Sequence, residues 1–143
     1  DLNRFIKRQN VPSELSNRLR EYFHQTEHLR LSIHQSTLLE SMSPSLQAEV
    51  SWSINQRWLG QVWFLEGAPM GFLVQLSRQM QAMVFAPLEI PPPGSLYIIH
   101  RGLIIYGARV LGAGAVFGED TCVLSNAALH TPYVARALSY VDI

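Results

Sequence analysis

Cysteine is almost absent from this sequence, and charge is sparse. The single cysteine, Cys122, excludes an intramolecular disulfide and a zinc site built from several cysteines, and it is typical of a reducing compartment. Charged residues make up 15% of the chain, and eleven basic residues balance eleven acidic ones. Because the charges balance, the chain has no overall field that would attract nucleic acid or an anionic membrane.

Long apolar runs are also missing. No run approaches the ~18–20 residues that span a bilayer, and the N-terminus lacks the pattern of a secretory signal peptide. Apolar residues nevertheless make up 48% of the 143 residues, which excludes a disordered chain and is enough for a domain with a real core. Since the chain starts at Asp1 without a methionine, we expect it to be part of something larger.

Glycine is missing from the whole first part of the chain. All nine glycines lie between Gly60 and Gly118. A long stretch without glycine favours helices, in which glycine costs about 1 kcal/mol relative to alanine. A glycine-rich stretch is typical of tight turns between short strands. We therefore predict helices over residues 1–59 and a mainly β-structure over residues 60–143, with the boundary near residues 59–68.

Apolar residues at helical spacing predict several short helices before this boundary. We interpret Ser13 as the N-cap of one helix. Its apolar face would consist of Leu15, Leu19, Tyr22 and Phe23. The pair Ser43-Pro44 predicts the start of another helix, because it places a cap before a proline at the first helical position.

A dense apolar patch occupies residues 58–65, at the boundary itself. We expect Trp58, Trp63 and Phe64 to pack the end of the helical segment against the strands, because aromatic side chains of this size bury large areas. Pro69 then predicts the start of one more helix.

Short apolar runs between glycine and proline turns predict strands after the boundary. They lie at residues 83–85, 96–99, 103–106, 109–111, 116–117 and 133–143. Strands this short, at a spacing of about 8–12 residues, favour a roll or barrel. The predicted fold class is therefore α+β: an N-terminal helical segment followed by an antiparallel β-roll, similar to a jelly roll, with short flanking helices.

Two ordered glycine motifs resemble the cyclic-nucleotide-binding fold. They are Leu96-Tyr97-Ile98-Ile99-x-x-Gly102 and Leu111-Gly112-x-Gly114-x-x-Phe117-Gly118-Glu119. In that family a G-x-G turn leads into a phosphate-binding cassette that begins Phe-Gly-Glu. Residues 38–65 resemble the C-linker that joins the pore to this domain in voltage-gated potassium channels and cyclic-nucleotide-gated channels, and residues 13–31 resemble that linker's helical hairpin. The likeness is greatest to channels of algae and other protists.

The resemblance implies a candidate cyclic-nucleotide site. Its residues would be Phe117, Gly118, Glu119, Asp120, His130 and Thr131. Backbone N–H groups at the turn would cradle the cyclic phosphate, and Glu119 would accept a hydrogen bond from the ribose hydroxyl. Members of the family that bind nucleotide have an arginine that contacts the phosphate, followed by a small residue. In this sequence the two positions align with Thr131 and Pro132, so the arginine is missing, and Pro132 has no N–H to offer. We therefore expect cAMP or cGMP to bind weakly or not at all, and no other cofactor.

Other interpretations of these residues stay open. Glu119 and Asp120 could instead cap backbone N–H groups at a turn. His24 and His28 have the i, i+4 spacing of metal ligands, but no third ligand is evident, so we expect no metal site. Basic residues near the N-terminus alternate with acidic ones, which favours a salt-bridged helical surface over a nucleic-acid interface. No nucleophile lies in a recognisable catalytic pattern, so we expect no enzyme.

The resemblance implies a cytoplasmic regulatory module of a voltage-gated potassium channel, in which the C-linker, residues 1–59, couples the β-roll, residues 60–143, to the pore. It implies other subunits of a homotetrameric channel as partners, through the linker helices. The parent protein would lie in a membrane, with this part soluble on the cytoplasmic side and a lid helix following Ile143. The alternative is a genuine cAMP- or cGMP-sensing domain of a cyclic-nucleotide-gated channel.

Overall fold

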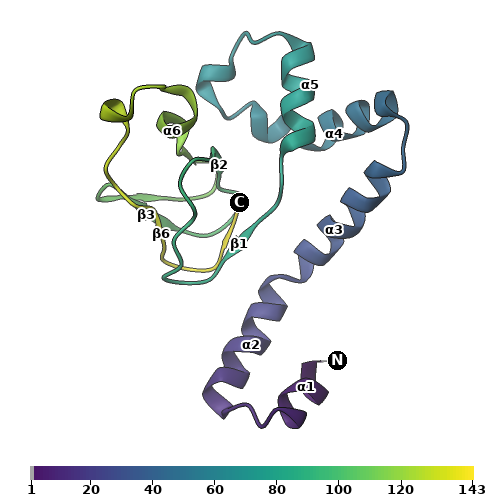
Figure 1. The fold of residues 1–143 in the computed structure, drawn as a ribbon, viewed down its shortest axis with the longest axis vertical. Coiled ribbons are helices and arrows are strands. Elements are labelled where there is room, and N and C mark those ends of the chain that lie inside the picture. Colours follow the sequence, from purple (N-terminus) through teal and green to yellow (C-terminus); the bar gives the residue numbers. More distant parts are fainter. Residues whose placement is uncertain (1) are drawn as a thin grey trace.

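The structure, a computed structural model, describes residues 2–143 except for the side chains of residues 28, 30–33 and 35–36. Three helices form an N-terminal arm whose far end extends away from the strands (Figure 1): α1 (Leu2–Arg8), α2 (Ser13–Gln25) and α3 (Glu27–Glu40). The chain reverses between α1 and α2, where Asn10 takes a φ of 53°. The helices expected in this part of the chain are confirmed.

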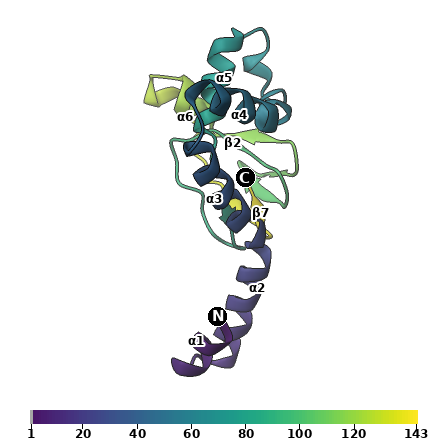
Figure 2. The same cartoon turned by 90° about the vertical axis from the view of Figure 1, so that its right-hand side faces the viewer.

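Two finer predictions for the arm are wrong. Pro12, and not Ser13, is the residue before α2, because its carbonyl accepts the first helical hydrogen bond, from the N–H of Ser16 at 2.8 Å. Residues 13–31 do not form a hairpin: α2 and α3 run on in nearly the same direction (Figure 1 and Figure 2). Thr26 alone separates the two helices, and one residue is too short a connection to reverse them.

A second helical group lies over one end of the strands. It consists of α4 (Pro44–Leu59), the 3-10 helix η1 (Trp63–Leu65) and α5 (Met70–Gln79). The predicted helix starts are confirmed, since Pro44 is the first residue of α4 and Pro69 directly precedes α5. The side-chain amide of Asn55 donates to the carbonyl of Ser77 at 2.9 Å, which holds α4 and α5 side by side.

Buried apolar residues join this helical group to the strands. Leu59, Val62 and Leu65 form one cluster with Ile98. Trp58 and Phe64 pack against the cluster in part, as the sequence predicts. The cluster includes residues from both sides of the expected boundary between residues 59 and 60, and this boundary stays a prediction.

Trp63 contradicts the predicted packing. Its side chain is 73% exposed, because η1 directs the neighbouring Val62 and Leu65 into the core and leaves Trp63 on the outer side. The indole ring meets the ring of the adjacent Phe64 edge-on, with the centroids 5.6 Å apart. The expectation that Trp63 packs the helices against the strands is therefore wrong.

Seven short strands form three antiparallel sheets in the described chain. They are β1 (Val84–Phe85), β2 (Tyr97–Ile98), β3 (Ile104–Tyr106), β4 (Arg109–Leu111), β5 (Val116–Phe117), β6 (Arg136–Ala137) and β7 (Val141–Asp142). The pairs are β1 with β7, β2 with β5, and β3 with both β4 and β6. Helices α6 (Glu119–Val123) and η2 (Ala127–Leu129) lie between β5 and β6. The α+β class is confirmed, whereas the jelly-roll-like β-roll stays a prediction.

The side chains between the sheets form the main core. They are Phe85, Tyr97, Ile99, Ile104, Phe117, Ala135, Ala137 and Val141. Because this core draws on β1, β2, β3, β5, β6 and β7, it holds the short strands together even though each has few ladder hydrogen bonds of its own.

The single strand expected over residues 133–143 is in fact two strands in different sheets. β6 pairs with β3, and β7 pairs with β1. Between them the carbonyl of Tyr140 crosses directly over Gly102, where an added Cβ would lie 2.2 Å from that oxygen. The hydroxyl of Ser139 accepts the N–H of Leu103 at 3.0 Å, so this crossing replaces regular strand pairing.

No helix within residues 2–143 combines the length and the apolar character needed to cross a bilayer.

Candidate functional site

Phe117, the first residue of the expected cassette, is a core residue. It is 3% exposed and stacks on the ring of Tyr97 with the centroids 5.0 Å apart. The ring of Tyr106 also packs against that of Phe117, with the centroids 5.6 Å apart. Phe117 therefore anchors the start of the turn in the core between the sheets and does not offer its side chain to solvent.

Gly118 makes the turn from β5 into α6. Its backbone is left-handed, with φ 83°, and it directly precedes the helix. An added Cβ would lie 2.3 Å from the carbonyl oxygen of Ser95. Both the backbone conformation and the close approach require glycine at this position.

Glu119 begins α6, and one of its oxygens has an unusual environment. Oε2 is the only buried side-chain oxygen or nitrogen without a hydrogen-bond partner in the part of the chain that the structure describes. An unpaired buried oxygen costs free energy, so such an atom can indicate a missing ligand or water. The ribose contact that the resemblance implies for Glu119 stays a prediction.

The carboxylate of Asp120 caps backbone N–H groups, as one interpretation of the sequence proposed for Glu119 and Asp120. Its Oδ1 accepts the N–H of Thr121 at 2.9 Å, and its Oδ2 accepts the N–H of Thr131. Hydrogen bonding from Thr131 is the main cause that lowers the pKa of the Asp120 carboxyl, with help from the N–H of Thr121 and the charge of His130. Asp120 thus joins the two ends of the expected site.

His130 is held by the backbone of the same loop. Its Nε2 lies 2.8 Å from the carbonyl oxygen of Leu124, which can only accept, so Nε2 carries the proton of this bond. Of the six expected residues, the structure brings Asp120, His130 and Thr131 together, with Gly118 and Glu119 at the start of the same turn, and places Phe117 in the core.

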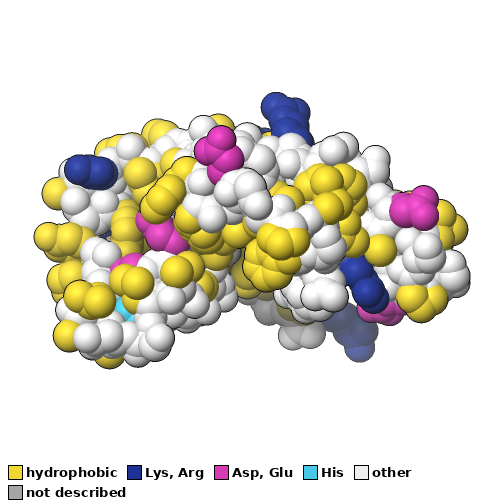
Figure 3. Space-filling view, turned by 90° about the horizontal axis from the view of Figure 1, so that it is seen from above, with side chains coloured by type: hydrophobic (Ala, Val, Ile, Leu, Met, Phe, Trp, Pro, Cys, Tyr) yellow, Lys and Arg dark blue, Asp and Glu magenta, His cyan; other side chains and the backbone are white. Residues whose placement is uncertain are grey.

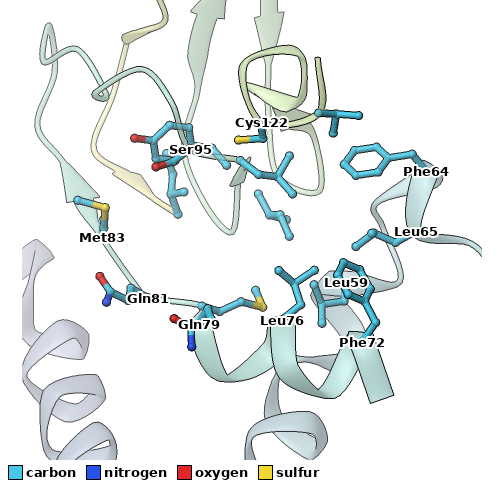
Figure 4. A pocket seen from close by; sticks show the side chains of 16 residues that line it. Leu59, Phe64, Leu65, Phe72, Leu76, Gln79, Gln81, Met83, Ser95 and Cys122 are labelled. Atoms are coloured by element: carbon cyan, nitrogen blue, oxygen red, sulfur yellow. The ribbon is translucent and has the colours of Figure 1, made fainter. Parts of the chain in front are cut away.

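A cavity of about 530 Å³ lies elsewhere, between the helical group and the strands. Figure 4 shows Leu59, Leu65 and Phe72 on one side of it and Ser95 with Cys122 across from them. None of the six expected site residues belongs to its lining. Leu76 of α5 also lines this cavity, and whether such a helix face is packed or hollow depends on the strands opposite it.

Apolar side chains are also exposed on the surface of these helices. Several large hydrophobic side chains of η1, α5, α6 and η2 are exposed: Trp63, Met70, Phe72, Val123 and Leu129. Figure 3 shows hydrophobic side chains gathered in patches on the face seen from above, with charged side chains scattered among them.

A contact that the sequence did not reveal joins the arm to the strands. Nε of Arg101 lies 2.8 Å from Oδ2 of Asp142 in β7, and its Nη2 donates to Oε1 of Gln25, the last residue of α2, at 3.0 Å. A second contact lies nearby, where the ring of Trp58 meets that of His100 at 4.7 Å. These partners are far apart in sequence, so no local pattern could have paired them.

The end of α2 also faces the segment before β7. Burial raises the pKa of Tyr140, the negative charge of Glu21 raises it further, and the positive charge of Arg18 lowers it. Both charged residues belong to α2, so the arm lies close to the strands over this helical turn as well as at Gln25 (Figure 2).

No cluster of three histidine, cysteine, aspartate or glutamate side chains suited to a metal is present among the described residues. His24 is exposed, and the side chain of His28 lies outside the described set. The i, i+4 pair expected from the sequence is therefore not testable as a metal site.

No family model matches the chain. It is 28% identical over 160 residues to the potassium voltage-gated channel unc-103 of Caenorhabditis elegans, covering 99% of this chain and 18% of the relative. It is 24% identical over 156 residues to the voltage-gated delayed rectifier potassium channel KCNH8 of Mus musculus, covering 100% and 14%. It is 29% identical over 154 residues to the voltage-gated inwardly rectifying potassium channel KCNH2 of Sus scrofa, covering 97% and 13%.

The chain thus matches segments of voltage-gated potassium channels along nearly its whole length and spans less than a fifth of those relatives, 18% at most among the three. The predicted resemblance to voltage-gated potassium channels is therefore confirmed. These three relatives are animal proteins, so the expected likeness to channels of algae and protists stays a prediction.

Proposed function

We propose that residues 1–143 form a cytoplasmic regulatory module of a voltage-gated potassium channel. In it, the helical linker couples a roll of the cyclic-nucleotide-binding type to the pore. The observation that carries this proposal is the similarity to named voltage-gated potassium channels over 97–100% of the chain, which includes both the helices and the strands.

The contacts between helices and strands support a coupling role. Leu59, Val62 and Leu65 share one buried cluster with Ile98 of β2, so the helical group cannot move without disturbing the strands. Arg101 ties the end of α2 to β7 at a second place. Two separated attachments would transmit a rotation of the strands to the arm, whereas one would act as a hinge.

Exposed apolar side chains on the arm support an assembly role. Phe5, Leu15, Phe23 and Leu38 are all exposed on α1, α2 and α3. In a homotetrameric channel such side chains would contact neighbouring subunits. Separated from the pore, the chain loses the effective concentration that the pore provides, so we expect weak association.

Sedimentation at rising concentration tests the assembly role, with and without residues 1–40. Weak, concentration-dependent association that disappears with the arm is the expected result. A tight oligomer that survives removal of residues 1–40 would contradict this role for the arm.

The channel assignment has two direct tests. The sequence of the complete transcript should encode six apolar spans and a Gly-Tyr-Gly or Gly-Phe-Gly filter upstream of these residues. In addition, residues 1–143 should replace the matching segment of mouse KCNH8 and leave a voltage-gated potassium current with a shifted voltage dependence. Surface labelling is the control. A chimera that reaches the surface but passes no more current than a channel lacking the segment would contradict the proposal.

The second candidate function is a cAMP or cGMP sensor. It is favoured by the buried, unpartnered Oε2 of Glu119 at the position expected for a ribose contact. Calorimetry with both nucleotides tests it. Micromolar binding that is lost in Glu119→Gln would favour the sensor, and binding of about 0.1 mM or weaker would favour the regulatory module without a ligand.

A further inference from the structure

The carboxylate of Asp120 occupies the place of an anion in the turn that leads from β5 into α6. One oxygen accepts the N–H of Thr121 at 2.9 Å, and the other accepts the N–H of Thr131, eleven residues further along the chain. Backbone N–H groups that converge on one point are the donors that would bind a phosphate. In this chain, two of them already have an anionic partner.

The surrounding charges make this occupation hard to reverse. Residues 110–135 contain no lysine or arginine, and Glu119 directly precedes Asp120. An incoming phosphate would therefore meet two carboxylates with no neighbouring guanidinium or ammonium from this stretch to offset them. The lowered pKa of Asp120 shows that the hydrogen bonds favour its ionised form.

The loop that Asp120 closes is bonded internally as well. The side chain of Asn126 accepts the N–H of Ala128 at 3.0 Å, and His130 donates to the carbonyl of Leu124 at 2.8 Å. The position of Thr131 is thus set by bonds within the loop and by Asp120. A ligand could reach the N–H of Thr131 only by displacing the carboxylate and breaking its charge-assisted hydrogen bonds.

We propose that Asp120 is a specificity-determining residue that makes the turn reject anionic ligands by supplying its own carboxylate to the N–H groups of Thr121 and Thr131. This inference rests on the proposed function, because it gives a reason for the weak or absent binding of cyclic nucleotides that we expect of such a module. The missing phosphate-binding arginine does not by itself have this effect. If an arginine were restored, the carboxylate of Asp120 would still accept the N–H groups of Thr121 and Thr131.

The first test follows the N–H of Thr131 directly. In the unaltered chain its amide proton should exchange slowly with solvent, and Asp120→Ala should speed this exchange about tenfold or more. Glu89→Ala is the matched control. Glu89 also accepts a backbone N–H, that of Ala86 at 2.8 Å, but in a different part of the molecule, so its removal should leave the exchange at Thr131 unchanged. Unchanged exchange at Thr131 in Asp120→Ala would overturn the proposal.

The second test uses cAMP as the probe, in a chain that carries Thr131→Arg with Pro132→Thr. Adding Asp120→Asn, which removes the charge and keeps the shape, should raise the affinity about tenfold over the arginine-restored chain. Equal affinities with and without Asp120→Asn would overturn the inference. Micromolar binding by the unaltered chain would instead overturn the proposed function, so the two failures are distinguishable.

Discussion

The guanidinium of Arg101 and the carboxylate of Asp142 form an ion pair in which one partner is exposed and the other is not. The side chain of Arg101 is 55% exposed and that of Asp142 only 7%, with Nε and Oδ2 2.8 Å apart. Because the buried partner is fixed in β7, it holds the guanidinium in one direction, toward Gln25 at the end of α2. The arm is thus attached through a side chain that the strands orient.

Removing Arg101 should weaken this attachment more than removing Gln25. Arg101→Ala takes the guanidinium away from a nearly buried carboxylate and should cost about 1–3 kcal/mol of unfolding free energy. Gln25→Ala removes one exposed hydrogen bond and should cost about 0.5 kcal/mol. Urea unfolding of both single variants and the double variant measures the coupling, with the exposed Arg109→Ala as control. Strict additivity would show that Arg101 and Gln25 do not interact in solution.

Trp63 should contribute little to stability despite its size. Because it is 73% exposed, Trp63→Ala should change the unfolding free energy by about 0.5 kcal/mol or less. Leu65→Ala, two residues away and buried, should cost about 2–5 kcal/mol, toward the lower end because Leu65 also lines the cavity. Thermal unfolding compares the two. A larger loss for Trp63 than for Leu65 would mean that the indole packs against something in solution.

Gly118 should not tolerate a methyl group. An alanine there would be strained at φ 83° and would press against the carbonyl of Ser95, so Gly118→Ala should cost about 3 kcal/mol or more. Gly94 is the matched control, because it has a φ of 96° and open space where a Cβ would lie. Gly94→Ala should cost about 1–2 kcal/mol. Chemical denaturation of both variants separates the clash with Ser95 from the strain of the left-handed backbone. Equal losses of unfolding free energy in the two variants would contradict the close approach of Gly118 to Ser95.

Cyclic nucleotides should bind poorly. We expect dissociation constants of about 0.1 mM or weaker for cAMP and cGMP, because Thr131 carries no charge and Pro132 has no N–H. Thr131→Arg with Pro132→Thr should improve the affinity if the turn has the shape of the cassette. Calorimetry on this chain and on a form that continues past Ile143 controls for the lid helix that the resemblance implies. Micromolar binding by the unaltered chain would favour the sensor instead.

Asp120 should stabilise the fold at neutral pH and lose this effect in acid. Its pKa is lower in the folded chain than in the unfolded one, so its contribution is fully present above the unfolded value of about 3.8. The contribution is lost as the pH falls through the lowered folded value. Asp120→Asn should therefore flatten the acid end of a curve of stability against pH, whereas Glu66→Gln, at an exposed carboxylate, should not. Identical curves for the two variants would contradict the role of the Thr131 contact.

The sequence singled out Gly118 only through its resemblance to the cassette, and its role in nucleotide binding stays a prediction. The close approach of Gly118 to the carbonyl of Ser95 is visible only in the structure. Phe117 was expected near the ligand, and its ring packs in the core against the rings of Tyr97 and Tyr106. The direction of an aromatic side chain at the end of a strand depends on which strands pair with it, and this pairing is not a local property.

The sequence by itself determined the order and the type of most elements. The absence of glycine before Gly60 predicted the helices, and Ser43-Pro44 predicted the start of α4, because backbone entropy and the missing proline N–H act within a few residues. Only the tertiary structure decided three further points. The side chain of Trp63 is exposed because those of Val62 and Leu65 occupy the core at this point of the chain. The last strand splits because Tyr140 must cross Gly102, and Asp120 reaches Thr131 because the loop between them folds back. Each of these depends on contacts between residues far apart along the chain, whose pairing is set by the packing of the whole fold.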